Sequence, residues 1–529
     1  MLAKQFIGKW TWWVLGGVAV THLIAILVRD TSFELPALIA IAILTIAVAW
    51  KSLPHGLMIA FAEVFTGGHG HLLDADLFGV SVSIRMIIFV AIMIVWFVRW
   101  IKRDLHPRVI LQRDAPWVVL AVAIAVGVLV GFLNNSPASV FDDANGYVAM
   151  LYLLPIISIN WTQLLRRDLL QTLAAGAIWL TLSTLTLSFL FTHLDGKALD
   201  PVYKFVRDSR LAEITLQVPD ATQLFVDYYY RIFLPSQMFI VVMSIIMIAA
   251  FLMLWRSQRM PELTALSFAL LASAGILSMS RSFLLGFAAA SVVLFVFSLR
   301  VGKRAVSNVT RRSVTAILLA ALGFGIAWST VAFPFPPNPD ISDASFYKTS
   351  AEVGREAGVT SRWQLVGPMM EKISESPIIG SGFGTEVAYT SDDPRLREQT
   401  GDGVISTYRF EWGYYDVWLK MGALGLIAIA LYFITLMRAT WFTIQRNGHA
   451  WLAAGLGASI LALYIINIFS PYMNHPIGIM LMLFALPFID FEGLARKIAE
   501  ARNRRTQKLS STKKLSPAVS SSSSSSRAD

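Results

Sequence analysis

The chain has 529 residues, of which 56% are hydrophobic and only 15% are charged. A soluble protein carries about 25% charged residues, so this composition excludes an ordinary soluble enzyme. The net charge of +10 does not indicate a nucleic-acid-binding protein, because the surplus lies in short connections and in the tail, and the lack of cysteine excludes disulfides and thiolate metal sites.

Apolar runs recur along most of the chain, and many are long enough to cross a bilayer as a helix, which takes about 20 residues. The sequence therefore predicts an all-α polytopic membrane protein with about 12–14 transmembrane helices. The predicted spans are 10–28, 35–50, 53–65, 79–100, 115–133, 146–162, 169–192, 232–255, 261–279, 282–299, 313–333, 413–437, 449–470 and 474–491. The segment 53–65 is short and carries Glu63, which favours a re-entrant or tilted helix.

Basic residues gather in one set of connections, as the positive-inside rule describes for the cytoplasmic side. These basic stretches are Lys4 with Lys9, 99–108, 166–168, 256–259, 300–312, 438–446 and the tail. We therefore predict that both termini are cytoplasmic. Four domains follow: an N-terminal bundle of about eleven spans (1–333, with an outer loop at 193–231), a periplasmic loop domain (334–412), C-terminal helices (413–491) and a disordered basic, serine-rich tail (492–529).

The first long outer connection contains GGHGHLLDAD at positions 67–76. Four of its side chains are of types that bind divalent cations: His69, His71, Asp74 and Asp76. A flexible polar loop has the same composition, and we favour that interpretation over a metal site. His193 and His475 also fall in outer connections and are alternative candidates for a catalytic base, while His22 lies inside an apolar stretch without an assigned role.

The stretch SMSRSFLLGF places Arg281 in a turn of two or three residues between two predicted spans, at the outer membrane boundary. One interpretation is an arginine that anchors a helix end in the interface. The alternative is a phosphate site, because a guanidinium is a planar fork that can hold two phosphate oxygens. Lipid phosphates and diphosphates lie at this depth of the membrane.

The outer connection 334–412 is too long to be a mere link between helices. It begins with FPFPPNPD, a polyproline-like exit from the membrane, and SRWQLVGPMMEKISESP predicts an amphipathic helix. The run GSGFG (380–384) has neither the preceding strand nor the Lys-Ser/Thr of a nucleotide-binding loop, so we expect a tight turn there.

Residues 361–387, SRWQLVGPMMEKISESPIIGSGFGTEV, resemble a motif of the O-antigen ligase and O-antigen polymerase (Wzy-type) superfamily. The matching residues are an arginine, a tryptophan, a proline and three glycines: Arg362, Trp363, Pro377, Gly380, Gly382 and Gly384. The stretch FEWGYYDVWLKMGALGLIAIALYF (410–433) is similar to the companion motif through Glu411, Tyr414, Gly422 and Gly425. SMSRSFLLGF resembles the Ser-Arg turn of the same family, and the resemblance covers about residues 230–490.

The resemblance implies a GT-C-like glycosyltransferase of the bacterial inner membrane that polymerises or ligates O-antigen, capsule or exopolysaccharide. Its donor would be a glycan on undecaprenyl pyrophosphate, and its acceptor would be lipid A core or another lipid-linked glycan. Arg281 and Arg362 would then bind the pyrophosphate, with Arg409, Tyr414 and Trp363 as further substrate-binding residues. The resemblance implies no cofactor or metal, and a flippase and a chain-length regulator as partners beside the bilayer.

Ligases of this family carry a histidine at the position that matches Glu411, and the outer connection here contains no histidine. A glutamate can serve as the general base if partial burial raises its pKa, and Phe410 and Trp412 are candidates to provide that burial. The alternative is a structural carboxylate paired with Arg409 or Arg362. The glutamate favours a polymerase over a strict lipid A core ligase.

A transporter or flippase of lipid-linked oligosaccharide is the alternative function, because many spans and outer arginines suit it as well. A flippase needs a cationic cavity through the bilayer centre and usually two similar halves. The sequence shows few cations within the predicted spans and no clear internal repeat. The long outer connection therefore favours the enzyme.

Overall fold

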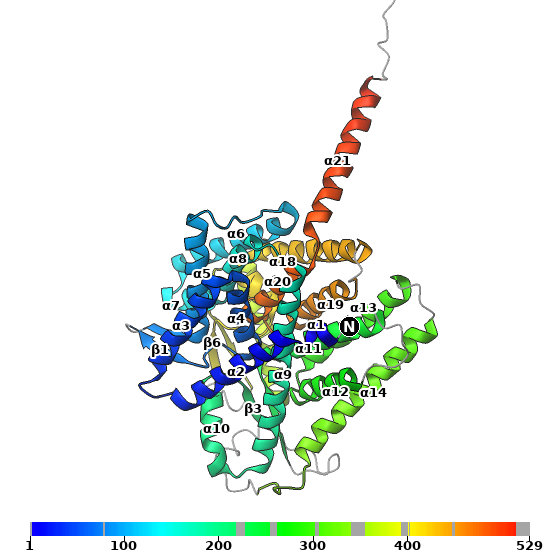
Figure 1. The fold of residues 1–529 in the computed structure, drawn as a ribbon. Coiled ribbons are helices and arrows are strands. Elements are labelled where there is room, and N and C mark those ends of the chain that lie inside the picture. Colours follow the sequence, from blue (N-terminus) through cyan, green and yellow to red (C-terminus); the bar gives the residue numbers. More distant parts are fainter. Residues whose placement is uncertain are drawn as a thin grey trace, which may run out of the picture.

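The computed structural model describes residues 3–77, 80–217, 228–253, 262–301, 306–339, 355–392, 400, 403–446 and 450–514. Within these ranges the chain forms a bundle of helices with three two-stranded sheets (Figure 1). Ten described helical segments are long and apolar enough to cross a membrane: α2 (Lys9–Val28), α3 (Glu34–Lys51), α5 (Ile84–Ile101), α6 (Leu111–Asn134), α7 to α8 (Pro137–Ser158), α9 (Gln163–His193), α11 with its preceding turn (Pro235–Met253), α13 (Arg281–Val301), α14 (Val306–Val331) and α18 (Gly413–Arg446). The prediction of an all-α polytopic membrane protein is therefore confirmed.

Shorter apolar helices occupy the remaining predicted spans: α4 (Leu53–Thr66), α12 (Glu262–Leu277), α19 (Ala450–Ile466) and α20 (Pro476–Ala485). The short helix α1 (Ala3–Phe6) precedes the first span. Helix α20 and its following turn meet α21 (Phe491–Lys514) at a bend of 66°. Every predicted span thus coincides with a helix in the part of the chain that the structure describes.

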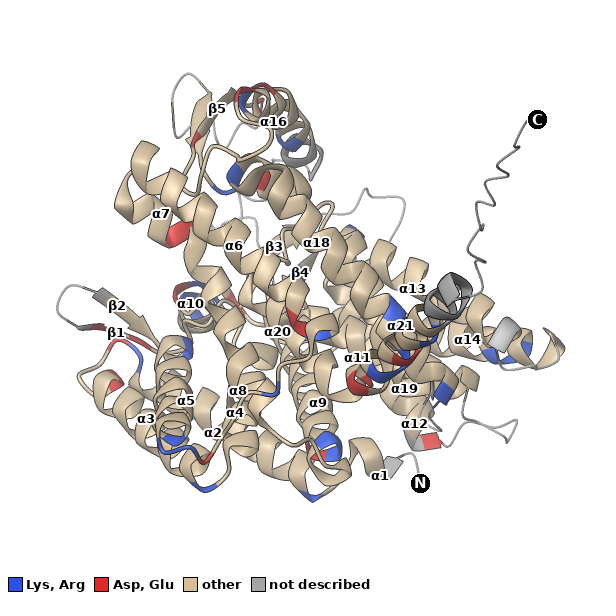
Figure 2. Ribbon diagram, turned by 90° about the horizontal axis from the view of Figure 1, so that it is seen from above, with Lys and Arg blue, Asp and Glu red and all other residues tan. Residues whose placement is uncertain are grey.

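The bundle has an apolar centre and an apolar outer surface. Helix α11 is buried on all faces because α9, α13 and α19 pack around it. On the outside, Trp13 and Leu27 are 67% and 68% exposed. Lipid is the medium that accepts such side chains without the cost of about 25 cal/mol per Å² of apolar surface in water. Lys, Arg, Asp and Glu are accordingly sparse along the helices in Figure 2.

The prediction of a disordered tail is wrong for its first part. Residues Phe491–Lys514 form helix α21, which projects from the bundle at the end opposite α10 (Gly196–Asp208) in Figure 1. The sequence FEGLARKIAEARNRR is rich in good helix formers and contains neither proline nor an interior glycine beyond its first turn. Residues from 515 onward, including the serine run, lie outside the described residues.

The hairpins and the remaining short elements gather at one end of the bundle, which we call the hairpin face. It comprises the connections 67–83, 194–233, 332–412 and 467–475, of which the described parts hold β1 (Asp74–Leu77), β2 (Val80–Ser83), β3 (Glu213–Gln217), β4 (Tyr229–Phe233), α16 (Arg355–Glu375), β5 (Val387–Thr390) and β6 (Val404–Thr407). Contacts join these connections: the amide of His69 donates to the carbonyl of Arg210 at 3.3 Å, and the hydroxyl of Tyr228 donates to that of Pro339 at 2.8 Å. In Figure 2, α16 and β5 lie together beside α7.

Candidate functional site

Arg281 lies at the N-terminus of α13, directly after the turn 278–280 that follows α12. The turn is tight, and Met279 adopts a left-handed backbone conformation with φ of 47°. The structure thus confirms the turn that the sequence predicted. The guanidinium of Arg281 is exposed, and no described residue forms a hydrogen bond or an ion pair with it. This cation is therefore available to an anion at the hairpin face.

Arg362 and Glu411 form an ion pair between α16 and the start of α18. The two side chains are 49% and 51% exposed, so both can be reached from outside the bundle. Of the two alternatives considered for Glu411, the structure therefore contains the pairing with Arg362.

The burial expected for Glu411 is not found, and that prediction is wrong. Phe410 and Trp412 are buried in a small core with Leu365 and Met369 of α16. Glu411 lies between them in sequence but is not part of this core, and its side chain is 51% exposed. Its neighbours in sequence are apolar, but they bury one another and leave the carboxylate in contact with solvent.

Two tryptophans stand beside this ion pair. The indole nitrogen of Trp412 donates to the carbonyl of Arg362 at 2.9 Å, and the rings of Trp412 and Trp363 meet edge to face at 4.7 Å between centroids. Trp363 is 59% exposed, whereas Leu365 and Met369 of the same helix are buried. An exposed aromatic face fixed by a second ring is suited to stacking against a sugar.

The other two predicted substrate-binding residues lie apart from the pair. The guanidinium of Arg409 is 69% exposed, 3.9 Å from the carboxylate of Asp142 and beside the ring of Tyr408. The hydroxyl of Tyr414 donates to the carbonyl of Tyr464 at 2.8 Å and so fastens α18 to α19. Tyr414 therefore has a structural bond, whereas Arg409 remains open to a ligand.

The segment 467–475 between α19 and α20 joins the two arginine positions. The hydroxyl of its Ser470 lies 3.1 Å from that of Ser282, next to Arg281. The ring of its Phe469 lies 5.6 Å from that of Trp412, next to the Arg362–Glu411 pair. Arg281 and Arg362, which are separated in sequence, thus border the same short segment on the hairpin face.

The GSGFG run is a tight turn, as predicted, and it serves as a packing device. Phe383 is buried between α6 and α18, and its amide donates to the carbonyl of Gly127 at 3.0 Å. Gly380, Gly382 and Gly384 all have φ between 76° and 90°, which suits glycine. A side chain at Gly382 would strike the backbone of Gly131. The run therefore fits closely against helix backbones and leaves no room for a nucleotide.

Helix α18 is broken where this turn docks. Gly422 has φ of 62° and ψ of −162°, outside the helical range, and the break frees backbone groups for bonds to the turn. The amide of Ser381 donates to the carbonyl of Leu419 at 2.7 Å, and the amide of Ala423 donates to that of Pro377 at 3.0 Å. The first glycine of the Gly-x-x-Gly motif, Gly422, is thus explained by the helix break.

A buried charge cluster supports the same region, and sequence reasoning missed it. Lys420 on α18 is paired with Asp416 one turn earlier and with Asp143 of α7 at 2.5 Å. The second oxygen of Asp143 accepts from the amide of Gly384 at 2.8 Å, and Asn474 donates to Asp416 at 2.6 Å. The only sequence signal was a lysine and an aspartate four residues apart inside an apolar helix, which is typical of a functional or paired charge.

Three polar residues noted in the sequence have structural partners. Both ring nitrogens of His193 lie 2.9 Å from backbone carbonyls, those of Phe189 and Phe333. His22 accepts from the indole nitrogen of Trp179 at 3.2 Å, and Glu63 pairs with Arg85 through contacts of 2.8 and 3.0 Å. His193 therefore lacks the free ring nitrogen that a base needs.

The two remaining candidate histidines meet each other. Nδ1 of His69 lies 3.3 Å from Nε2 of His475, although they are 406 residues apart in the sequence. His71 lies instead 3.4 Å from Asp74. No group of three or more metal-binding side chains occurs among the residues that the structure describes. The stretch 67–76 thus contributes to a histidine pair.

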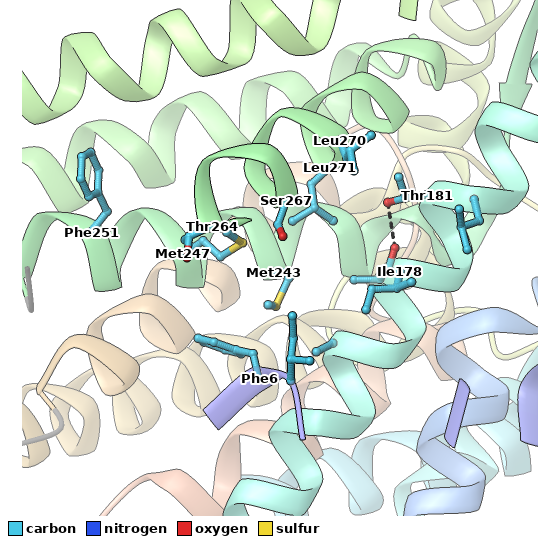
Figure 3. Close-up of a pocket in the computed structure, with 14 residues that line it drawn as sticks. Phe6, Ile178, Thr181, Met243, Met247, Phe251, Thr264, Ser267, Leu270 and Leu271 are labelled. Carbon is cyan, nitrogen blue, oxygen red and sulfur yellow. Dashed lines mark hydrogen bonds between the residues drawn. The ribbon is translucent and has the colours of Figure 1, made fainter. Parts of the chain in front are cut away.

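Two cavities among the described residues lie away from this site. One, of about 150 Å³, is lined by apolar side chains of α1, α9, α11 and α12, including Phe6, Ile178, Met243 and Leu271 (Figure 3). The other, of about 190 Å³, lies among α6, α18 and α21. No arginine of the hairpin face lines either of these two cavities.

Residues 266–430 match the O-antigen ligase family model. The matched region begins in α12, contains Arg281, Arg362 and Glu411, and ends within α18. No curated protein matches this sequence.

Proposed function

From the match of residues 266–430 to the O-antigen ligase family, we propose that the protein is a glycosyltransferase of the bacterial inner membrane. It polymerises or ligates a surface polysaccharide (O-antigen, capsule or exopolysaccharide) at the periplasmic side, which is the hairpin face. The donor is a glycan on undecaprenyl pyrophosphate, and the acceptor is another lipid-linked glycan or lipid A core. Both termini then lie in the cytoplasm, in agreement with the basic connections at the opposite end of the bundle.

The observation that carries this proposal is the exposed guanidinium of Arg281, which pairs with no residue that the structure describes. Such a cation at the predicted membrane boundary is suited to an anion that arrives attached to a lipid. The exposed Arg362 lies along the same 467–475 segment and provides a second planar fork. Two such groups match the oxygens of a diphosphate.

The Arg362–Glu411 pair has a direct role in this mechanism. The incoming diphosphate competes with Glu411 for Arg362, and the exchange releases the carboxylate. The bound diphosphate places negative charge beside Glu411, which favours proton uptake in place of the missing burial, and Glu411 then accepts the proton of the acceptor hydroxyl. The pair thus keeps the base occupied until the donor is bound.

The transfer is a single displacement. The acceptor oxygen forms a bond to the anomeric carbon, the bond from that carbon to the diphosphate oxygen breaks, and the electron pair leaves with the diphosphate. Arg281 and Arg362 stabilise the negative charge that develops there. A single displacement inverts the anomeric configuration.

The test is transfer by the purified full-length protein in nanodiscs with a lipid-linked glycan. Arg281→Ala and Arg362→Ala should each lower kcat by about 10²–10³, as the loss of a donor to a developing oxyanion does. Lys204→Ala is the matched control, because Lys204 is also an exposed cation of the hairpin face and is 63% exposed. Wild-type turnover in both arginine variants would contradict the proposal.

Glu411→Gln tests the base separately. Glutamine keeps the shape but cannot accept the proton, so transfer should fall by about 10²–10⁴. Full turnover in this variant would place the base elsewhere. A ladder of lengthening products would identify a polymerase, and a single addition to lipid A core would identify a ligase.

A further inference from the structure

A second group of cationic and donor side chains lies on the hairpin face, at the other end of the 467–475 segment. It consists of His69, His475, Arg210 and Arg409, from four connections that are distant in sequence. Arg210 is exposed, and no described residue pairs with its guanidinium. Unlike Arg281 and Arg362, His69 and Arg210 lie outside the region matched to the family.

Buried arginines hold the connections that carry this group. Arg29 donates to the carbonyl of His71 at 2.7 Å and to that of Asp208 at 2.7 Å, and so ties the first outer connection to the end of α10. Arg85 donates to the carbonyl of Gly68 at 3.0 Å while it pairs with Glu63. Their side chains are only 9% and 13% exposed. The positions of His69 and Arg210 are therefore fixed before any ligand arrives.

The hydrogen bonds determine which nitrogen of His69 carries its proton. The amide of Ile477 donates to Nδ1 of His475 at 3.2 Å, so the proton of neutral His475 is on Nε2. That Nε2–H donates to Nδ1 of His69. Neutral His69 consequently holds its proton on Nε2, and this N–H donor of an exposed side chain has no partner among the described residues.

The surroundings keep His69 neutral. One part of the His69 side chain is exposed, but burial of the rest by the surrounding chain is the main cause that lowers its pKa, to about 4, and the charges of Arg85, His71, Arg210 and Arg409 lower it further. Burial is the main cause that lowers the pKa of His475, and His69 and Arg85 lower it further. His69 with an occupied Nδ1 is therefore a hydrogen-bond donor at neutral pH and cannot serve as a general base.

We propose that His69, Arg210 and Arg409 bind the diphosphate of a second polyprenyl-linked glycan, the acceptor. The Nε2–H of His69 and the two guanidinium groups are all donors, and such a set matches an anion with several oxygens. The inference rests on the proposed function for the identity of this ligand. It favours polymerisation, since both substrates then carry the same lipid diphosphate.

The experiment counts bound molecules of farnesyl diphosphate on full-length protein in phosphatidylcholine nanodiscs by native mass spectrometry and calorimetry. Wild-type protein should bind two molecules. Arg281→Ala should bind one molecule, at the second site. The His69→Phe/Arg210→Ala variant should also bind one molecule, at the donor site. The variant that combines all three substitutions should bind none. Arg207→Ala is the matched control, because Arg207 is exposed on the same connection as Arg210 but pairs with Asp208 at 2.7 Å.

Conservative substitution separates a donor from a structural residue. His69→Gln keeps an N–H donor and should bind the second molecule, whereas His69→Phe should weaken it about tenfold, as the loss of one charge-assisted hydrogen bond does. In transfer assays His69→Phe should raise the KM for acceptor with kcat nearly unchanged. A loss of kcat in His69→Gln would instead indicate a base and would overturn the proposal.

Two further outcomes would also overturn it. If the His69→Phe/Arg210→Ala variant still binds two molecules of farnesyl diphosphate with wild-type affinities, these residues do not form the second site. Displacement of the second molecule by equimolar phosphatidylglycerol or inorganic diphosphate would assign the site to phospholipid headgroups or to a free anion. These binding results do not depend on turnover, so they are separable from failure of the proposed function, which the Arg281→Ala and Arg362→Ala transfer assays decide.

Discussion

The functional side chains of the hairpin face differ in what holds them. Arg281 is exposed and pairs with no described residue, whereas Arg362 is held by Glu411. Glu411 itself stays half exposed because Phe410 and Trp412 pack against α16 without it. Nδ1 of His69 lies 3.3 Å from Nε2 of His475, so each histidine fixes the ring of the other.

The histidine pair predicts a pH dependence of stability. Because the pKa of His69 falls from 6.5 to about 4 in the folded protein, the unfolded chain binds the proton more tightly. Stability is therefore lost as the pH falls from about 7 toward 4. The thermal unfolding temperature of purified protein should drop over this range, and it should drop less in His69→Gln. Parallel pH curves for both proteins would contradict the role of His69.

At the scale of elements, the break in α18 depends on one glycine, and its loss should be measurable in the free energy of unfolding. Gly422 has φ of 62°, and a β-carbon there would collide with the carbonyl of Ile378. Gly422→Ala should lower the free energy of unfolding by about 2 kcal/mol or more. Gly325→Ala is the control, because Gly325 lies within α14 with open space around it, and it should be neutral or stabilising by about 1 kcal/mol. Equal melting temperatures for the two variants would contradict this interpretation of the break.

The buried cluster around Lys420 provides a second prediction at this scale. Lys420→Met leaves Asp143 and Asp416 without their cation, and the loss of one partner from a buried ion pair costs about 3–5 kcal/mol. Addition of Asp143→Asn and Asp416→Asn removes the unpaired charges and should recover part of this loss. Thermal unfolding of the single and triple variants measures both effects. No recovery in the triple variant would show that the lysine acts by more than charge balance.

For the whole molecule, the lack of cysteine allows the orientation to be measured directly. Asp76→Cys on the hairpin face and Ser307→Cys at the start of α14 are exposed positions at opposite ends of the bundle. In intact cells with a permeable outer membrane, a membrane-impermeant maleimide should label the first and not the second. Labelling of the second after lysis is the control for reactivity. The reverse pattern would place the hairpin face in the cytoplasm and would contradict the proposed use of a periplasmic lipid-linked donor.

Much of the architecture was predictable because each membrane span is a local run of apolar residues. The spans and the amphipathic helix around Arg362 were found in this way. The three hairpins were missed, since strands such as DADL and VSVS are short and polar. The tail helix was missed because charged, serine-rich composition is typical of disordered segments. The packing of GSGFG and the Lys420 cluster depend on contacts between α6, α7 and α18, which no single segment reveals.

The segment 467–475 has a thermodynamic consequence through its two ends. One end contacts the surroundings of Arg281 and Arg362, and the other provides His475 to the second group. A ligand that shifts the segment 467–475 at one end changes the affinity of the other end for its own ligand. Linkage makes this effect equal in both directions. In the proposed polymerase, two lipid substrates bound at the two ends of this segment would load as a coupled pair, and each round of chain growth would start from the doubly occupied protein.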